Sequence, residues 1–320
     1  MELDTLKLLS RHAGGSFLPV LATVCVYATE SGNRAQVGNG RYVVDVPTAL
    51  VPMTINVERF VAAASACGRM PDVSVGAAFV SVSAGRVRAR IQVDPTAYPV
   101  AKPDPRTAVA VPGVGEVLRI LQPFVATDAS KPWATSVCLS GDHAYATNNV
   151  VLVRHPLAAP VDHPVCIPIA AIEAITERGP VVDVGLTENA VTFYYGDDSW
   201  VKTQLMSGDW PTHTVDGYLK GLDDGVWETV NQSLGDMLTT AARMGTDRNP
   251  VVQFGNGGLA LVDQTFEADE LDPVPDAGKV SARMAALVFA VADRVQWHTP
   301  RTDVHAFRAG ELCGVFGGTR

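Results

Sequence analysis

The residue types that most often perform chemistry in proteins are present in this chain, but their spacing fits neither a catalytic site nor a metal site. The seven histidines form no His-Glu-x-x-His pattern and no other close pair of metal ligands. His155 and His163 fall in a proline-rich segment that we predict to be a loop. The acidic pairs at 197–198, 223–224 and 269–270 stand near glycine or proline, as solvated loop residues do. We therefore expect no metal and no catalytic residues.

A nucleotide-binding loop is the next candidate. Gly113 and Gly115 open a predicted helix, as the glycines of a dinucleotide-binding loop do, but no third glycine follows at the required spacing. The sequence contains neither Gly-x-x-x-x-Gly-Lys-Ser/Thr nor Gly-x-Ser-x-Gly, which mark phosphate-binding loops and serine nucleophiles. These patterns predict a protein that is not an enzyme and carries no cofactor.

The cysteines and the hydropathy pattern predict a cytoplasmic protein. The five cysteines lack the Cys-x-x-Cys spacing of zinc and redox sites, and their apolar neighbours predict reduced, mostly buried thiols. No run of about 18 apolar residues is free of charge. The start of the chain is acidic, whereas a signal peptide would start with basic residues.

Composition predicts well-packed globular units, because 47% of the residues are hydrophobic and 18% are charged. The formal net charge of −9 repels the phosphates of a nucleic acid unless basic residues gather on one surface. The distribution of charge, rather than its sum, therefore decides whether DNA is a partner.

An internal repeat organises the chain. Residues 92–99 read Gln-Val-Asp-Pro-Thr-Ala-Tyr-Pro and residues 204–211 read Gln-Leu-Met-Ser-Gly-Asp-Trp-Pro, so glutamine, an aliphatic residue, an aromatic residue and proline recur in register. Before each copy, a predicted helix ends near a proline, and an alternating apolar pattern begins a strand. The C-terminal part of the chain follows the same plan. The sequence therefore predicts three repeated units.

Each unit is predicted to contain two helices and several strands. The six helices are predicted at 2–12, 56–70, 115–126, 167–178, 232–244 and 281–294. Hairpins are predicted at 79–91, 191–198 and 254–261, where apolar residues flank glycine-containing turns. The elements do not alternate as βαβ units, so the predicted class is α+β. Proline, glycine and aspartate collect at the boundaries, which gives units at 1–105, 106–217 and 218–320.

Three short segments carry a resemblance to a known family. Residues 18–21 read Leu-Pro-Val-Leu, where that family has Leu-Pro-Ile-Leu. Residues 146–152 read Ala-Thr-Asn-Asn-Val-Val-Leu, where it has Ala-Thr-Asp-Gly-His-Arg-Leu, and residues 202–211 match its segment ending in Asp-Gly-Arg-Phe-Pro. The order of these segments, together with the repeat, makes the chain resemble the bacterial DNA polymerase III beta sliding clamp. The resemblance runs nearly from one end of the chain to the other. The divergence favours a phage or mobile-element clamp.

The resemblance implies a DNA clamp fold, in which two helices of each unit are backed by antiparallel sheets. Two protomers of this family close head to tail into a ring around duplex DNA, with the helices inside, and tether a replicative polymerase as a processivity factor. Two alternatives remain open. One is a clamp-fold adaptor or transcription partner that does not encircle DNA, and the other is an unrelated acidic α+β enzyme.

Basic residues on or beside the predicted helices are candidates for DNA contact. A clamp that slides must contact phosphates weakly and read no bases, and arginine suits such contacts. The alternative is that these residues belong to ordinary solvated helix faces. The candidates are Lys7, Arg11, Arg59, Arg69, Arg119, Arg178, Arg243, Arg248, Arg283 and Arg294.

The resemblance also implies a hydrophobic cleft that receives a short peptide of the polymerase or the clamp loader. One wall would be Thr147, Asn149, Val150 and Leu152, the other would be Val315 and Phe316, and Tyr218 would lie at the floor or rim. Phe316 stands close to the end of the chain, which predicts an exposed ring. The sequence departs from the family at 149–151 and in its last residues, so either a different peptide or weaker binding is expected. The alternative is that these apolar residues belong to an ordinary strand core.

Overall fold

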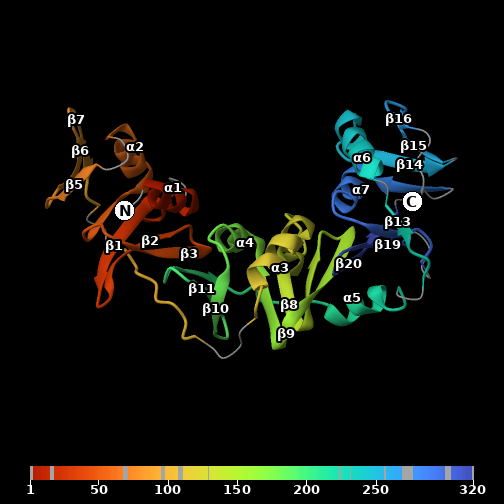
Figure 1. Cartoon of the computed structure of the whole chain (residues 1–320), viewed down its shortest axis with the longest axis horizontal. Coiled ribbons are helices and arrows are strands. Elements are labelled where there is room, and N and C mark those ends of the chain that lie inside the picture. The colour runs from red at the N-terminus through yellow and green to blue at the C-terminus, as the bar shows by residue number, and fades with distance from the viewer. Residues whose placement is uncertain are drawn as a thin grey trace. The chain divides into compact units, whose positions relative to one another are not determined.

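A computed structural model of the chain shows an α+β protein, with four antiparallel sheets among the residues that it describes (Figure 1). The structure describes residues 3–14, 18–67, 71–94, 98–106, 111–128, 130–222, 225–230, 232–255, 257–268, 277–299 and 304–318. Two compact units are present, one of Met1–Glu116 with Ala170–Leu205 and the other of Val117–Ile169 with Met206–Arg320. In the part of the chain that the structure describes, no helix is long and apolar enough to cross a membrane.

The first compact unit contains a seven-stranded sheet of order β10-β11-β12-β3-β2-β1-β4 and a three-stranded sheet of order β5-β6-β7. Its helices are α1 (Leu3–His12), η1 (Pro19–Ala22) and α2 (Val57–Cys67). Its strands are β1 (Thr23–Thr29), β2 (Gly32–Gly38), β3 (Tyr42–Thr48), β4 (Met53–Asn56), β5 (Asp72–Val75), β6 (Phe79–Ala84), β7 (Val87–Gln92), β10 (Val181–Leu186), β11 (Ala190–Tyr195) and β12 (Trp200–Gln204). Two helices, α3 (Val114–Leu121) and α4 (Ile169–Thr176), contain the points where the chain passes between the compact units.

The second compact unit contains a six-stranded sheet of order β13-β18-β19-β20-β9-β8 and a four-stranded sheet of order β16-β15-β14-β17. Its helices are η2 (Gln122–Phe124), η3 (Pro132–Thr135), α5 (Thr212–Leu219), α6 (Gln232–Met244) and α7 (Ala282–Phe289). Its strands are β8 (Ser136–Thr147), β9 (Val151–Pro168), β13 (Glu228–Thr229), β14 (Val251–Gly255), β15 (Gly258–Leu261), β16 (Glu267–Ala268), β17 (Ala277–Ser281), β18 (Arg294–Gln296), β19 (Val304–Ala309) and β20 (Leu312–Gly317).

Helices pair side by side in both compact units, α1 with α2 and α6 with α7 (Figure 1). In α6, Leu234, Leu238 and Ala241 recur at helical spacing and are buried. Fully burying one leucine side chain contributes about 1.5–3 kcal/mol. Helices α6 and α7 can approach closely because Gly235 has no side chain. A Cβ at this position would lie only 2.8 Å from the carbonyl oxygen of Phe289. The apolar stripes of the helices therefore face inward, and their charged residues face solvent.

Strand pairing joins segments from different sequence repeats. In the first compact unit β12 pairs with β3, and in the second β20 pairs with β9. Each pairing merges strands that are far apart in the sequence into one sheet. The compact units therefore divide the chain differently from the expected units 1–105, 106–217 and 218–320, and that repeat-based division stays a prediction.

The hairpins and one helix were predicted correctly. Strands β6 and β7, β11 and β12, and β14 and β15 form the three expected hairpins. The helix predicted at 232–244 has the bounds of α6. Turn glycines and a clear apolar stripe mark these elements in the sequence.

Three helix predictions were too long, and the one at 115–126 ends as an α-helix at Leu121 and continues only as η2 to Phe124. The helix expected at 281–294 ends at Phe289, and Arg294 begins strand β18 instead. The backbone N–H of Asp293 donates to the carbonyl of Arg308 at 2.8 Å, so pairing with β19 takes the chain out of the helix. The helix expected at 167–178 starts at Ile169, because β9 extends to Pro168, and it ends at Thr176.

The loop predicted around His155 and His163 is wrong, because both residues lie in β9. β9 pairs with β8 along most of its length, with register shifts on either side of Gly141. Proline lacks an N–H donor and is tolerated in a sheet where the ladder is interrupted. Helix α5 was not predicted, since its sequence overlaps the glycine- and aspartate-rich stretch taken as a boundary.

The five cysteines are free, and Cys25, Cys138 and Cys166 are buried. Burial raises the pKa of the Cys25 thiol, which keeps it protonated at neutral pH. These side chains act as small apolar residues of the cores.

Candidate functional site

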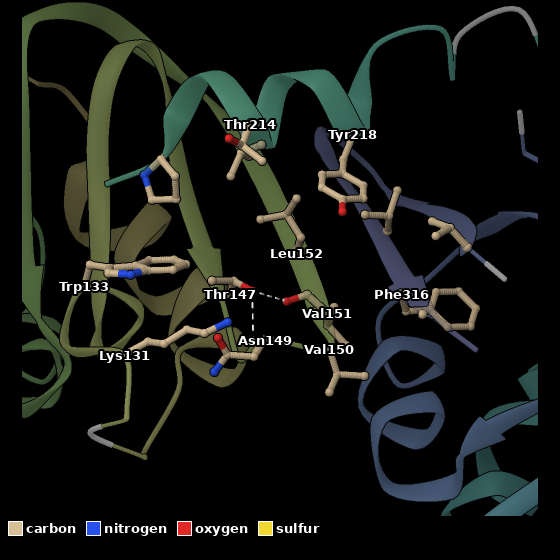
Figure 2. Close-up of a pocket in the computed structure, with 15 residues that line it drawn as sticks. Lys131, Trp133, Thr147, Asn149, Val150, Val151, Leu152, Thr214, Tyr218 and Phe316 are labelled. Carbon is tan, nitrogen blue, oxygen red and sulfur yellow. Dashed lines mark hydrogen bonds between the residues drawn. The ribbon is translucent and has the colours of Figure 1, made fainter. Parts of the chain in front are cut away.

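A pocket of about 430 Å³ opens in the second compact unit, where segments from distant parts of the sequence meet (Figure 2). Its walls are η3, the turn between β8 and β9, one face of α5, and residues of β19 and β20. Pockets that bind ligands commonly have volumes of about 300–1,000 Å³. We call this pocket the cleft.

A hydrogen-bonded turn forms one wall of the cleft. The Oδ1 atom of Asn148 accepts from the backbone N–H groups of Val150 and Val151 at 3.1 and 2.8 Å. The hydroxyl of Thr147 donates to the carbonyl of Val151 at 2.8 Å and accepts from the N–H of Asn149 at 3.0 Å (Figure 2). Asn149 has φ of 72°, a left-handed conformation that asparagine tolerates better than most residues. The turn is thus rigid, and Val150 projects from it with 43% of its surface exposed.

Helix α5 presents one face to the cleft. Thr214, Val215 and Tyr218 line it, and their spacing of three or four residues places them on one side of a helix. Pro211, at the N-cap position, also lines it. Val215 and Leu219 are buried in the core beneath. The helix is therefore anchored to the sheet while the Tyr218 side chain stays accessible.

Aromatic residues in and next to η3 pack together and support the cleft. The ring of Trp133 lies edge-on against that of Trp210, with centroids 5.3 Å apart, and the indole N–H of Trp210 donates to the carbonyl of Trp133 at 2.9 Å. The hydroxyl of Tyr145 donates to Asp216 at 3.0 Å. Burial and this hydrogen bond raise the pKa of Tyr145 well above its usual range, so the phenol remains a donor. The aromatic support is therefore in place before any ligand arrives.

Strand β20 closes the opposite wall through its pairing with β9. Val315 lies opposite Leu152, and Phe316 lies opposite Val151. The expectation that Phe316 is exposed is wrong, because only 1% of its surface is accessible. Its ring packs against those of Phe289 and Trp297 in the core. Alternation along the strand explains this, since neighbouring side chains point to opposite faces.

The side chains of the cleft suit an apolar ligand. Among the described residues that line it, Lys131 carries the single charge and none carries a carboxylate. The Lys131 ammonium lies 6.0 Å from the centroid of the Trp133 ring. The hydroxyl of Thr147 is already bonded within the turn, so it is no free nucleophile. Apolar side chains with one cation at the edge suit a peptide with hydrophobic residues.

All of the residues that the sequence assigned to the partner cleft lie on the walls of this pocket: Thr147, Asn149, Val150, Leu152, Tyr218, Val315 and Phe316. Whether the pocket receives a peptide stays a prediction. The cleft is also lined by Lys131, Trp133, Thr214 and Val304, which were not predicted from the sequence. Trp133 could have been found from the sequence, because it follows a proline in residues 131–134 just as a hydrophobic residue follows the proline in residues 18–21.

The basic residues predicted to face DNA do not share one environment. Exposed side chains on helices α1, α2, α3, α6 and α7 are Lys7, Arg11, Arg59, Arg119, Arg243 and Arg283. Arg11 forms an ion pair with Glu177 at 3.3 Å. Arg248 is exposed in the segment between α6 and β14, and Arg294 is exposed on strand β18.

Arg178 is the member of this set that differs most. It follows α4, its side chain is only 6% exposed, and it forms an ion pair with Asp197 at 3.1 Å. Its Nε–H donates to the hydroxyl of Ser199 at 3.0 Å, and its guanidinium lies over the ring of Tyr195. These contacts give it a role in holding the 196–199 turn. Arg69 lies outside the described residues.

Comparison with solved structures identifies the fold. The structure matches the DnaN sliding clamp, DNA polymerase III subunit beta, of Bartonella birtlesii bound to griselimycin, with a TM-score of 0.82 and 15% identity, over 99% of this chain and 97% of that one. It matches the DNA polymerase sliding clamp of Bacillus subtilis with a TM-score of 0.79 and 15% identity, over 99% and 96% of the chains. It matches the Helicobacter pylori beta clamp bound to a DNA ligase peptide with a TM-score of 0.75 and 9% identity, over 99% and 97%. Neither a protein-family model nor a curated protein matches this sequence.

The chain therefore has the DNA clamp fold. More particularly, it has the fold of the bacterial DNA polymerase III beta sliding clamps, along nearly its whole length. The fold class predicted from the repeat and the resemblance is confirmed.

Proposed function

We propose that the chain is a DNA sliding clamp that works without catalysis. Two copies close head to tail into a ring around duplex DNA in the cytoplasm, and the cleft on each copy holds a short peptide of a polymerase or a clamp loader. The observation that carries the proposal is the apolar cleft, which the clamp fold forms from the residues that the resemblance assigns to partner binding. The low identity to the solved bacterial clamps favours a phage or mobile-element origin.

Peptide binding in the cleft is supported by its chemistry. The strand β20 and the helix α5 offer a groove with apolar walls, and the turn at 147–151 is fixed by its own hydrogen bonds. A groove fixed in advance binds an extended segment without an ordering cost of its own. The Helicobacter pylori clamp has been solved with a DNA ligase peptide, which is a partner of this kind.

Ring closure is supported by opposite charges on two sheet edges. Arg88 and Arg90 are exposed on β7, an edge strand of the three-stranded sheet, and Arg86 is exposed in the preceding turn. Glu267 is exposed on β16, an edge strand of the four-stranded sheet, and the sequence continues with Asp269 and Glu270. A basic edge on one copy and an acidic edge on the next can pair in a head-to-tail ring.

DNA contact is assigned to the exposed basic residues of the helices. The chain as a whole repels phosphate at a net charge of −9, so attraction has to come from residues gathered on particular elements. Arg59 on α2, Arg243 on α6 and Arg283 on α7 are exposed on helices that pair within their compact units. Their role is non-specific contact with phosphates, which permits sliding.

The double substitution Arg59→Glu with Arg243→Glu tests this assignment. We expect it to weaken binding of a linear duplex at low salt by about tenfold or more, because each reversal replaces phosphate attraction by repulsion. The dependence of affinity on salt should become shallower, since fewer counterions are released. Fluorescence anisotropy of a labelled duplex, titrated at several salt concentrations, measures both quantities.

The matched control is Lys102→Glu with Lys220→Glu, which makes the same change of charge at exposed positions outside the helices. The control should bind the duplex nearly as the parent protein does. Superimposable binding curves for the helix variant and the parent would contradict the assignment. An equal loss in the control would point to net charge alone.

A further inference from the structure

A second pocket lies in the first compact unit. Its volume is about 320 Å³. It is lined by the turn between β2 and β3, by the last residues of β12, by η1, and by the extended segment that begins at Tyr98. We call it the second pocket.

The turn of the second pocket repeats the asparagine hydrogen bonds of the cleft's turn, while Gly38 stands where the cleft has the hydroxyl of Thr147. The Oδ1 atom of Asn39 accepts from the N–H groups of Arg41 and Tyr42 at 2.9 and 3.1 Å, as Asn148 Oδ1 does from the corresponding groups of its own turn. The N–H of Asn39 donates to the carbonyl of Tyr42 at 3.2 Å, as that of Asn148 does to Val151 at 3.2 Å. The following residue is left-handed in both turns, with φ of 83° at Gly40 and 72° at Asn149.

The other walls correspond in the same way. Lys202 of β12 lies opposite Val43 of β3, just as Val315 of β20 lies opposite Leu152 of β9. Just after η1, the hydroxyl of Thr23 donates to the carbonyl of Val20 at 2.7 Å. Just after η3, the hydroxyl of Ser136 donates to the carbonyl of Trp133 at 2.7 Å. The pairs Tyr98-Pro99 and Trp210-Pro211, which are in register in the sequence repeat, line or support the two pockets.

The charge of the two pockets differs. Arg41 occupies the position that Val150 has in the cleft, and Lys202 occupies the position of Val315. The Lys202 ammonium is bound by Asp104 at 2.7 Å, but no described residue forms an ion pair with the exposed Arg41. None of the described residues that line the second pocket carries a carboxylate. The second pocket therefore combines apolar walls with an arginine available to a ligand.

The wall formed by residues 98–101 is held in place. The N–H of Ala101 donates to Oε1 of Gln36 at 2.7 Å, and the Nε2 group of Gln36 donates back to the carbonyl of Ala101 at 3.1 Å. Gln36 is itself buried and also donates to Asp45 at 3.0 Å. The extended segment thus takes the place that α5 has in the cleft, and it is anchored to β2.

We propose that the second pocket is a second peptide-docking site, and that it takes an extended partner segment with a carboxylate next to an apolar residue. The apolar side chain rests on Val20, Leu21 and Val43, and the carboxylate pairs with the Arg41 guanidinium. The inference rests on the proposed function, because the second pocket is compared with a cleft that is itself proposed to bind a peptide.

The test uses the full-length protein and a synthetic probe peptide of sequence Leu-Asp-Asp-Leu-Phe that carries a photoactivatable benzophenone and a fluorophore. Binding is measured by anisotropy, and the sites of cross-linking are mapped by mass spectrometry. A neutral probe with Asn in place of both Asp residues serves as the chemical control. Leu152→Arg blocks the cleft, Arg41→Asp removes the cation of the second pocket, and Lys220→Asp is the matched charge control at an exposed position.

We expect the acidic probe to bind Leu152→Arg and to cross-link near residues 38–43 or 98–101. Arg41→Asp in that background should weaken binding about tenfold or more, and so should the neutral probe, because a charge-assisted hydrogen bond is lost in each case. Loss of all binding in Leu152→Arg, with cross-links only at the cleft, would overturn the second site while leaving the proposed function intact. Failure of the probe to bind the parent protein at either place would overturn the second site as well.

Discussion

Replacing Arg88 and Arg90 with glutamate is expected to split the proposed two-copy ring into single chains. Both residues are exposed on the edge strand β7, and the proposed partner edge carries Glu267 with further acidic residues after it in the sequence. The substitutions would place like charges against each other across the interface, which costs several kcal/mol. A cost of about 3 kcal/mol raises the dissociation constant roughly a hundredfold. Sedimentation velocity over a range of concentrations measures the shift.

The charge-swap variant shows whether the two edges meet. Adding Glu267→Arg to the double variant should restore a large part of the lost association, because opposite charges then face each other again. Lys102→Glu with Lys220→Glu alters the net charge equally and should leave the dimer unchanged. A dimer that persists in Arg88→Glu with Arg90→Glu, at the same dissociation constant, would contradict this assignment of the interface.

Leu152→Arg is expected to abolish peptide binding in the cleft. Leu152 lines the cleft and packs against the core cluster beneath it, opposite Val315 on the neighbouring strand. A guanidinium at this place fills the apolar wall and has to be desolvated when a peptide binds. We expect affinity for an apolar, uncharged peptide ending in Leu-Phe to fall by about a hundredfold, while the ring stays closed. Fluorescence anisotropy with such a labelled peptide measures the loss.

The matched control for this change is Val182→Arg. Val182 is 55% exposed on β10 in the other compact unit, so it receives the same chemical substitution away from the cleft. Its thermal stability and peptide affinity should equal those of the parent protein. If Leu152→Arg retained full affinity for the peptide, the cleft would not be the docking site.

Some of the fold was readable from local signals in the sequence. Helix α6 was predicted with its observed bounds because an apolar stripe with helical period runs between polar ends. The hairpins were predicted because glycine-containing turns separate alternating strands. Strand β9 was missed, since its prolines argue for a loop and only its pairing with β8 makes it a strand. Helix α5 was missed because its short apolar pattern lies among residues typical of loops.

The candidate site shows the same limit. The resemblance brought Leu152 and Val315 to one cleft, although their pairing is a matter of strand register that periodicity alone does not determine. The burial of Phe316 was missed because exposure follows from which face of β20 meets the core. Arg178 was grouped with the DNA-facing residues because its partner Asp197 lies on a distant turn. The second pocket includes Tyr98 and Pro99 of the sequence repeat, but the repeat alone did not indicate that Arg41 would line the same pocket.

The solution mass of the purified protein tests the central claim most directly, because the proposed ring around DNA requires two copies. Size exclusion with light scattering should give a mass near twice 33.9 kDa, and this mass should persist on dilution to the micromolar range. A mass of one chain at every concentration would contradict the ring and leave a clamp-fold adaptor that does not encircle DNA.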